Sequence, residues 1–196
     1  MHKLLTFISC LWYFFVGKII SYFVYDKKYL KGRWFKGKYK SFGSIGWRWV
    51  VKDTFYNFFH GNGLRSKYPI GKNCYVVNSE NILFDPNDLN NFHGFGNYYQ
   101  AIGKIVIGRG TYIAPNVGLI TSNHDLHDLD NHLEPQDIII GKKCWIGMNS
   151  TILPGVVLGD STIVGAGSVV TKSFEEGNCV IAGNPAQLIR SINKES

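Results

Sequence analysis

The sequence predicts an all-β solenoid preceded by an apolar, helical N-terminal extension, and three observations lead to this prediction. The main one is a ladder of six aliphatic residues spaced six positions apart: Ile140, Ile146, Ile152, Leu158, Val164 and Val170. Shorter ladders with the same spacing occur upstream, and residues 1–60 differ from the rest in charge. A fixed period of six fits neither a helix of ~3.6 residues per turn nor simple strand alternation, so a repeat architecture is expected.

Each six-residue repeat is expected to form a short strand followed by a corner. Compact side chains stand two positions before the ladder residues, and residues two apart share one face of a strand. They are Cys144, Ser150, Val156, Thr162 and Ser168. Corners are marked by a glycine directly after the ladder residue, or by Leu153-Pro154-Gly155 at one of them. Three repeats would close one triangular coil of about 18 residues, and stacked coils would share a continuous core.

The repeats set the expected domain boundaries. Two further blocks keep the spacing: Ile107, Ile113 and Leu119, and Ile70, Val76 and Ile82. We therefore expect a solenoid domain over residues 66–190, an extension over 1–65 and a tail over 191–196. Segments 84–104 and 123–139 interrupt the ladder and are rich in Asn, Asp, His and Gly, which predicts loop insertions. A β-sandwich with regular strand spacing is the alternative, and the run of six-residue steps disfavours it.

Cysteine usage and charge narrow the class of protein. The four cysteines are scattered and form no C-x-x-C pair, so we expect reduced packing residues in a cytosolic setting rather than a zinc site. The formal net charge is +7, but residues 1–60 hold 11 Lys/Arg against 2 Asp/Glu, while residues 61–196 hold 10 against 12. The solenoid itself is therefore not expected to bind a polyanion.

The N-terminus combines an apolar segment with a basic one. Leu4 to Gly17 is uncharged and rich in aromatics, and after Lys18 the apolar character continues from Ile19 to Tyr25. A run of this length is at the lower limit for a helix that spans a membrane. A secretory signal peptide is a second interpretation, but no cleavage site of small residues follows the run. The third interpretation is a helix that lies on the membrane or packs against a partner subunit. Seven basic residues follow: Lys27, Lys28, Lys31, Arg33, Lys36, Lys38 and Lys40. This combination favours a peripheral or shallowly inserted anchor at the anionic cytoplasmic leaflet of a membrane. The alternatives are a helix that packs in an oligomer and a nucleic-acid-binding segment, but the sequence contains no motif that reads nucleic acid.

Candidate chemistry lies in the second interruption. It begins Thr121-Ser122-Asn123-His124-Asp125, directly after a predicted coil side. A histidine at such a rim could take a proton from an attacking alcohol or amine at neutral pH. Backbone N–H groups at glycine corners could stabilise the oxygen of a thioester under attack. From spacing alone, a loop histidine is also compatible with a solvated or purely structural role.

The motifs then resemble a known family. Ile146-Gly147 through Val164-Gly165-Ala166-Gly167-Ser168-Val169-Val170-Thr171-Lys172, followed by Ala182-Gly183-Asn184-Pro185-Ala186, resemble the hexapeptide-repeat acyltransferases, within them the galactoside/maltose and surface-polysaccharide O-acetyltransferases. The resemblance covers roughly residues 105–190. It implies a left-handed parallel β-helix, a homotrimer with active sites between subunits, acetyl-CoA as acyl donor and a carbohydrate acceptor.

The resemblance also implies roles for individual residues. His124 matches the catalytic histidine, Asn116 an acceptor-side polar residue, and Trp145 a tryptophan packed against the catalytic region. The positions that match the acetyl-CoA wall are Trp145, Met148, Ala166, Thr171, Lys172 and Arg190, while Gln187 stands where a second basic residue is common. Asp125, Asp128, Asp130, Glu134 or a backbone carbonyl could orient His124. Asp85, with Asp88, His93 and Asn97 in the first interruption, is expected to line the acceptor pocket, and Asp125 is a second acceptor candidate.

Other functions compete with an O-acetyltransferase acting on a sugar hydroxyl. An N-acetyltransferase of a nucleotide-linked amino sugar is the nearest alternative, and serine acetylation is another. His124, His127 and His132 could bind zinc as in γ-class carbonic anhydrases, but they lie on one loop, and we expect no metal. A non-catalytic scaffold or lectin-like solenoid would show no acyl transfer at all.

Overall fold

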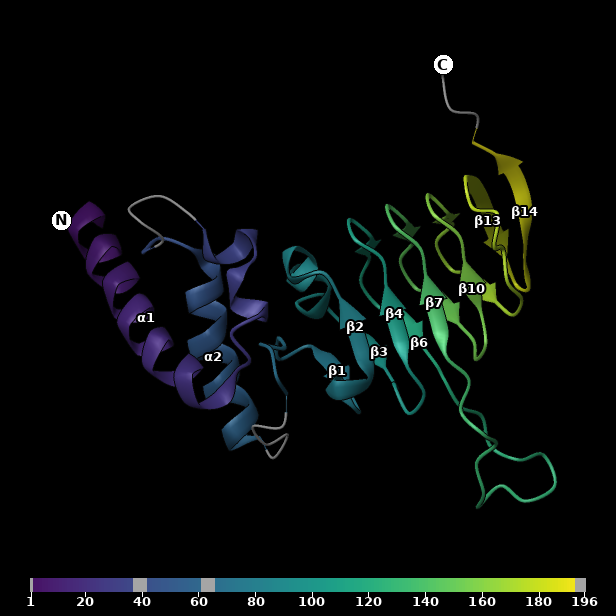
Figure 1. Cartoon of the computed structure of the whole chain (residues 1–196), viewed down its shortest axis with the longest axis horizontal. Helices are drawn as coiled ribbons and strands as arrows, with labels where there is room; N and C mark the ends of the chain where they lie inside the picture. The colour runs from purple at the N-terminus through teal and green to yellow at the C-terminus, as the bar shows by residue number, and fades with distance from the viewer. Residues whose placement is uncertain (1, 37–41, 61–65, 193–196) are drawn as a thin grey trace. The chain divides into compact units, whose positions relative to one another are not determined.

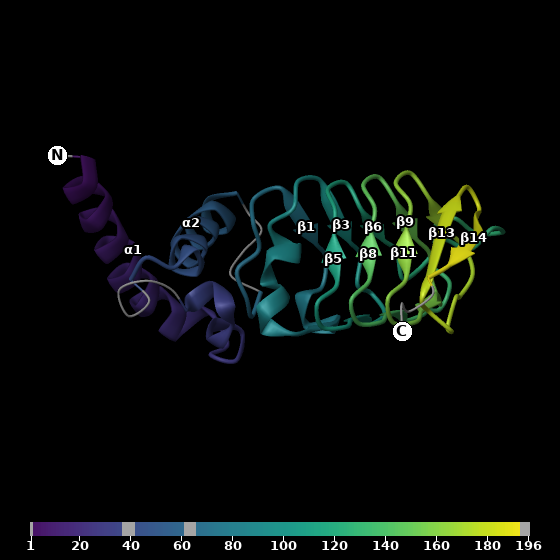
Figure 2. The same cartoon turned by 90° about the horizontal axis from the view of Figure 1, so that it is seen from above.

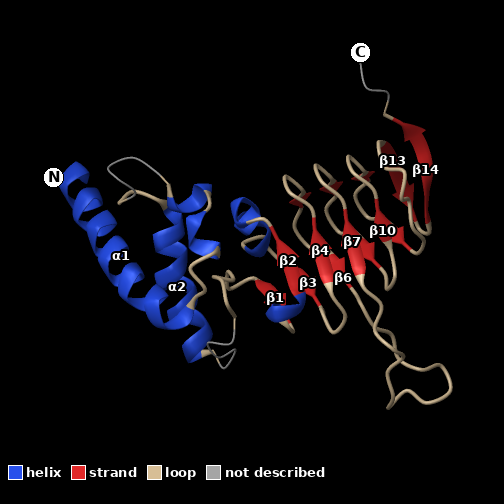
Figure 3. Cartoon of the chain, viewed as in Figure 1, coloured by secondary structure: helices blue, strands red, loops and turns tan. Residues whose placement is uncertain are grey.

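The computed structural model describes residues 2–36, 42–60 and 66–192, and its chain divides into two compact units, residues 1–72 and 73–196. The first unit is helical and the second is built from short strands (Figures 1 and 3). The helices of the first unit are α1 (His2–Val24), η1 (Tyr29–Lys31), η2 (Arg33–Phe35) and α2 (Ile45–Phe59). The expected extension is thus two packed α-helices rather than one apolar segment, and α2 was not anticipated from the sequence.

The two helices of the first unit run in the same direction. The Arg48 guanidinium lies 5.3 Å from the ring centroid of Tyr13 near the start of α2, and the hydroxyls of Tyr25 and Thr54 are 2.8 Å apart further along. Gly17 allows the close approach, because a Cβ added there would lie 3.1 Å from the Trp47 ring. Burial raises the pKa of the Tyr25 phenol, partly offset by the hydrogen bond to Thr54. The contact between α1 and α2 therefore includes a neutral, hydrogen-bonded tyrosine.

The second unit is a three-sided coil of parallel strands. Its strands and short 3-10 helices are β1 (Cys74–Val76), η3 (Ser79–Asn81), β2 (Ile82–Phe84), η4 (Pro86–Phe92), β3 (Asn97–Tyr99), β4 (Ile105–Ile107), β5 (Tyr112–Ile113), β6 (Gly118–Leu119), β7 (Ile138–Ile140), β8 (Trp145–Ile146), β9 (Thr151–Ile152), β10 (Val157–Leu158), β11 (Ile163–Val164), β12 (Val169–Val170), β13 (Cys179–Gly183) and β14 (Ala186–Ser191). The strands form sheet A (β1-β3-β6-β9-β12), sheet B (β2-β4-β7-β10) and sheet C (β5-β8-β11-β13-β14), and from β3 to β12 successive strands pass in turn to sheets A, B and C (Figure 2). Among the strands in the described residues, only β14 is antiparallel to its neighbour, β13.

The register confirms the six-residue ladder. Ile146 pairs with Val164 and Ile140 with Leu158, 18 residues apart, which is three repeats of six. All six ladder residues are at most 1% exposed, as are the compact residues two positions before them, so both sets point into the coil. Ile113 pairs with Ile146 across 33 residues, which is one 18-residue coil plus a 15-residue insertion. The period therefore determined both the strands and their partners.

The two interruptions behave differently. Residues 84–104 are not a simple loop, because they contain η4 and β3, and β3 continues sheet A between β1 and β6. Buried amides make this possible: Asn97 Oδ1 accepts from Val117 N at 3.2 Å, and Asn91 Oδ1 accepts from Ile113 N at 3.1 Å. The second interruption is a true insertion that extends away from the coils between β6 and β7 (Figure 1), although 138–139 belong to β7.

The corners between sheets C and A, here called the CA edge, form a column of left-handed residues. Gly96, Asn116, Asn149 and Gly167 have φ of 73°, 57°, 61° and 70°. Glycine and asparagine tolerate this conformation best, which explains why these residue types stand there. Backbone bonds link successive corners, such as Asn116 N to Phe95 O at 2.8 Å and Gly167 N to Met148 O at 2.8 Å. Side chains on this edge are thus stacked one coil above another, ~4.8 Å apart.

Candidate active site

His124 lies on a short hairpin that leaves the corner between sheets A and B, here called the AB edge. Its base is tied to the preceding coil, because the backbone N–H groups of Thr121 and Ser122 both donate to Gln100 Oε1, at 2.9 and 2.8 Å. His124 and His132 form an antiparallel bridge, flanked by the bonds Asp125 N to Asn131 O (2.9 Å) and Leu133 N to Asn123 O (2.8 Å). The insertion therefore holds His124 in a defined backbone position.

A backbone carbonyl orients the imidazole. Nδ1 of His124 lies 2.7 Å from the carbonyl oxygen of Leu129. A carbonyl oxygen can only accept, so Nδ1 carries the hydrogen in the neutral ring and Nε2 is left as the basic atom. The ring centroids of His124 and His132 are 4.1 Å apart at 38°. The side chain is exposed, so Nε2 is open to an incoming substrate.

The nearby carboxylates cap the turn of the hairpin instead of binding the imidazole. Asp125 Oδ1 accepts from the backbone N–H of His127 at 2.7 Å, and Asp128 accepts from Asp130 N (3.2 Å) and from Asn131 Nδ2 (2.7 Å). The open question of what orients His124 is thus answered by Leu129, which sequence reasoning could not single out. Neither the Leu129 carbonyl nor the His132 stack has a sequence signature, since both depend on how the hairpin closes.

Asp85, expected to line the acceptor pocket, is engaged in local structure. Its Oδ1 accepts from Asn87 N and Asn87 Nδ2, both at 2.8 Å, at the start of η4. Its Oδ2 lies 3.6 Å from Arg109 Nε. Asp85 follows β2, so it lies on the third edge of the coil, between sheets B and C. Neither Asn116 nor His124 is on that edge. These contacts describe a helix cap and an ion pair.

The expected cofactor-binding residues are divided between two edges and sheet C. Met148 and Ala166 share the CA edge with Asn116, on successive coils, whereas Thr171 and Lys172 follow β12 on the AB edge. Trp145 is 59% exposed on the outer face of β8, and Arg190 is exposed on β14, both in sheet C. Because the coil has three sides, sheet C is the side that lies opposite the AB edge. Within one chain, therefore, Trp145 does not face the corner that carries His124.

The distances between edges are considerable. Asn116 and Thr121 are five residues apart along the extended side that includes β6, which corresponds to ~17 Å at ~3.3 Å per residue. Lys172 lies on the same edge as the His124 insertion, two coils further along, which corresponds to about 10 Å. One chain thus presents His124 and Lys172 on one edge, and Asn116, Met148 and Ala166 on another.

The expected oxyanion donors at the glycine corners are already occupied. The N–H groups of Gly147 and Gly165 donate to Val164 O and Ile181 O of the next coil, at 2.9 and 2.8 Å. Gly108, Gly141 and Gly159 do the same. An N–H that completes the coil-to-coil ladder is not available to a substrate oxygen, so the expectation was wrong for these five glycines.

Cationic and apolar side chains lie side by side where the turn after β12 meets β14. Lys172 Nζ donates to Gln187 Oε1 at 3.0 Å and lies 5.7 Å from the ring centroid of Phe174. Gln187, which replaces a second basic residue, thus holds Lys172. Leu188 and Ile189 are 56% and 60% exposed beside it on β14. Among the residues described, no group of three His, Cys, Asp or Glu side chains could hold a metal ion.

Comparisons of the sequence with known proteins find acetyltransferases. The family described as "Bacterial transferase hexapeptide (six repeats)" matches residues 137–172. A candidate lipopolysaccharide biosynthesis O-acetyl transferase of Escherichia coli (strain K12), WbbJ, is 30% identical over 189 residues, covering 80% of this chain and 94% of its own. The galactoside O-acetyltransferase of the same organism is 32% identical over 70% of this chain and 74% of its own. A candidate acetyltransferase of Saccharomyces cerevisiae is 40% identical, but only 48% of its length is spanned.

Solved structures show the same relationship. A maltose O-acetyltransferase from Clostridium difficile 630 has a TM-score of 0.51 and 30% identity over 64% of this chain and 66% of its own. A galactoside acetyltransferase in complex with coenzyme A has a TM-score of 0.53 and 25% identity over 91% of this chain and 80% of its own. Together with the near full-length Escherichia coli relative and the observed three-sheet coil, these matches show that the chain belongs to the hexapeptide-repeat acetyltransferase family.

Proposed function

We propose that this protein is an acetyl-CoA-dependent O-acetyltransferase that modifies a sugar hydroxyl during cell-surface polysaccharide biosynthesis. The observation that carries the proposal is the orientation of His124, whose Nδ1–H is held by the Leu129 carbonyl at 2.7 Å so that Nε2 is free to accept a proton. Family relatives named for galactoside, maltose and lipopolysaccharide acetylation support the choice of a sugar. The fold is proposed to be the left-handed form of the β-helix, as in that family.

The chain's own residues account for the proton transfers. Nε2 of His124 would take the proton of the acceptor hydroxyl as that oxygen attacks, and the Leu129 carbonyl would stabilise the imidazolium through Nδ1–H. Acetyl-CoA supplies the thioester carbonyl carbon and, as the C–S bond breaks, the departing thiolate. The imidazolium then returns its proton to that sulfur, so the histidine is unchanged at the end of a cycle.

The side chains of the coil fit such a donor. The exposed Trp145 and Met148 (59% and 44%) offer apolar surface for the pantetheine arm. Lys172 and Arg190 offer exposed cations for phosphates, and no carboxylate among the described residues pairs with either. We assign the acetyl-CoA contacts to these residues together with Ala166 and Thr171, and the acceptor contacts to Asn116 and Asp125.

We further propose that the active form is a homotrimer with sites between subunits. The division of the site residues between two edges supports this, because the CA edge and sheet C of one subunit can face the AB edge of its neighbour. Trp145, which lies opposite the AB edge of its own chain, would then approach the neighbouring His124. Analytical ultracentrifugation tests the assembly, and a stable, active monomer would contradict it.

A peripheral location at the cytoplasmic face of the membrane completes the proposal. The helix Lys3–Val24 is long and apolar enough to cross a membrane, and 11% of its most apolar window is buried within the chain. Six of its nine exposed large apolar residues follow one helical stripe, spaced three or four apart: Leu4, Ile8, Trp12, Phe15, Ile19 and Tyr22. Lys18 lies within this length and Gly17 packs against Trp47, which favours a helix in the interface over a spanning one.

Two experiments test the activity, and a third tests the location. The purified protein is incubated with acetyl-CoA and candidate sugars, and release of the CoA thiol is followed; mass spectrometry compares surface polysaccharide from cells with and without the protein. Acetylation of an amine in place of a hydroxyl would support the N-acetyltransferase alternative, and no turnover with any acceptor would support a scaffold.

The location is tested by cell fractionation. The double variant Ile8→Asp and Phe15→Asp should leave the membrane fraction, whereas a wild-type protein that stays soluble without detergent would refute the anchor.

A further inference from the structure

The helical unit contains a cavity that the acetyl-transfer reaction does not use. Its volume is about 490 Å³, and it is lined by Phe14, Lys18, Leu30, Lys31, Phe35, Lys36 and Trp47. The lining comes from α1, from the segment around η1 and η2, and from α2. All of these lie in residues 1–72, so the cavity belongs to one compact unit.

Three lysine amines at this cavity have no carboxylate to neutralise them. Lys18, Lys31 and Lys36 are all exposed. In the described parts of this unit, the acidic side chains are Asp26, which lies 3.8 Å from Lys28 Nζ, and Asp53, which is buried on α2. The cavity therefore concentrates positive charge, and a ligand that is an anion would be stabilised there.

Two buried aromatic side chains, Phe35 and Trp47, line the cavity, and one of them carries an unsatisfied donor. Phe35 and Trp47 are both 4% exposed, with ring centroids 5.0 Å apart. Within the described residues, the buried indole Nε1 of Trp47 has no hydrogen-bond partner. An unpaired buried N–H is energetically unfavourable, so an acceptor that reaches this group would be stabilised there. Lys18 Nζ lies 4.8 Å from the centroid of the same ring, and both residues line the cavity.

The apolar surroundings distinguish a lipid from a free anion. The cavity wall includes Phe14 and Leu30, and α1 continues past it with the exposed apolar stripe that ends near Ile19 and Tyr22. A free phosphate would use the lysines and leave this surface in water. An amphiphile would use both, with its headgroup at the lysines and its chains along the stripe.

We propose that this cavity binds the phosphate group of an anionic membrane lipid. The inference rests on the membrane location proposed above and adds a defined headgroup site to it. Lys18, Lys31 and Lys36 contact the phosphate oxygens, and Trp47 Nε1 donates to one of them. The positive charge of residues 1–60 then forms more than a diffuse surface, because three of its lysines act at one place.

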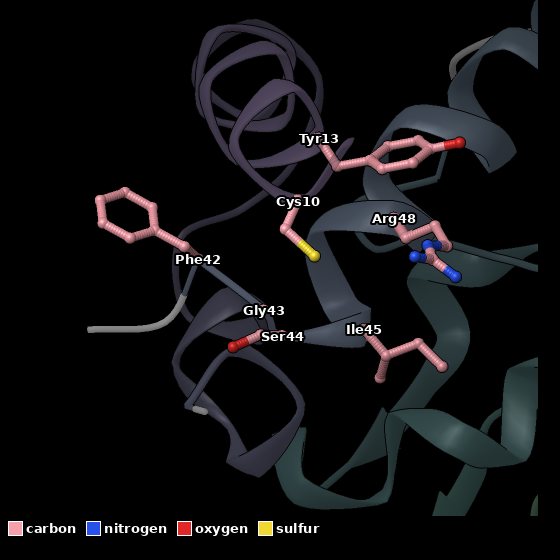
Figure 4. Close-up of a pocket in the computed structure, with 7 residues that line it drawn as sticks. All are labelled: Cys10, Tyr13, Phe42, Gly43, Ser44, Ile45 and Arg48. Atoms are coloured by element: carbon pink, nitrogen blue, oxygen red, sulfur yellow. The ribbon is translucent and has the colours of Figure 1, made fainter. Parts of the chain in front are cut away.

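The test compares two triple variants of the full-length protein that carry the same net charge. The cavity variant is Lys18→Gln, Lys31→Gln and Lys36→Gln. The control is Lys3→Gln, Arg48→Gln and Lys52→Gln, all exposed and outside the cavity. Arg48 instead borders a separate cavity of about 140 Å³ with Cys10, Tyr13 and Ser44 (Figure 4). Binding is measured by sedimentation with phosphatidylcholine vesicles, with and without phosphatidylglycerol.

The cavity variant should bind phosphatidylglycerol vesicles on the order of 100-fold more weakly than wild type, since each of its three lysines loses a direct hydrogen bond to the phosphate, which contributes about fivefold. The control should lose much less, and Trp47→Phe should weaken binding while keeping the aromatic ring. Equal losses in both triples would overturn the site in favour of diffuse attraction. Full competition by millimolar inorganic phosphate would overturn the lipid assignment. Acetyl transfer to a soluble sugar should be unchanged in every variant, so a failure of the lipid site is distinguishable from a failure of the proposed activity.

Discussion

Nδ1 of His124 lies 2.7 Å from the carbonyl oxygen of Leu129, five residues further along the same hairpin. This single contact fixes the neutral tautomer and directs the basic Nε2 outward. It replaces the carboxylate partner for which the sequence offers several candidates. A carbonyl cannot accept the proton, so it orients the ring and stabilises its charged form without taking part in proton transfer.

His124→Ala should lower kcat by ~10²–10⁴ because the general base is removed. The matched control is His127→Ala, an exposed histidine on the same hairpin whose backbone N–H, not its ring, is used by Asp125. Steady-state release of the CoA thiol measures both. Near-normal turnover of a folded His124→Ala variant would refute the assignment.

His132 should act as a positioning residue through its ring contact with His124, at 4.1 Å between centroids. His132→Ala should lower kcat with little change in KM for the acceptor, whereas His132→Phe should restore most of the activity, since it retains a flat ring. The pH profile of kcat separates stacking from proton transfer. A loss in both variants alike would show that the imidazole itself is required.

Active sites between subunits predict complementation. Asn116→Ala and His124→Ala change different edges of the coil, and each should be weakly active alone. If the two are unfolded and refolded together in equal amounts, about one quarter of all sites in the refolded population should hold both wild-type residues. Recovered activity near that fraction supports a shared site, and a mixture no better than its components would place both residues in one chain's site.

The ladder should carry the stability of the coil. Ile152 is fully buried, so Ile152→Ala should destabilise the protein by about 2–5 kcal/mol. Ile139, on the outer face of β7, is 42% exposed, and Ile139→Ala should cost much less. Urea unfolding curves compare the two. Similar losses would mean that the ladder is not the core.

The thiol of Cys74 predicts a loss of stability at alkaline pH. Burial raises its pKa from 9.0 to about 12, so the folded state keeps the proton while the unfolded state releases it. Between pH 9 and about 12, the free energy of unfolding should therefore fall by up to ~1.4 kcal/mol per pH unit on account of this group. The contribution is fully present below pH 9. Comparison with Cys74→Ala isolates it, and parallel curves would contradict the prediction.

Burial also raises the pKa of the Cys144 thiol. Because the thiolate is the reactive form, thiol reagents at pH 8 should label Cys74 and Cys144 only after unfolding. All four cysteines are free in the structure. Rapid labelling of either buried residue in the folded protein would show that the coil opens there.

The sequence by itself determined the coil, because a six-residue period places every third repeat on the same sheet and leaves few other ways to bury the ladder. Ile146 therefore pairs with Val164 as the spacing requires. The sequence also singled out His124, since a histidine at an insertion is visible as a break in the pattern. It did not reveal that residues 84–104 contain a helix and a strand, because buried Asn91 and Asn97 look like loop residues until their amides are paired.

Only the tertiary structure decided how the site residues are distributed. The closing of the hairpin brings the Leu129 carbonyl to His124. Each six-residue repeat moves the chain to the next side of the coil, so Asn116 and His124 lie on different edges. Neither follows from residue type. The hairpin depends on bonds between residues several positions apart, and the edge of a residue depends on how many corners precede it.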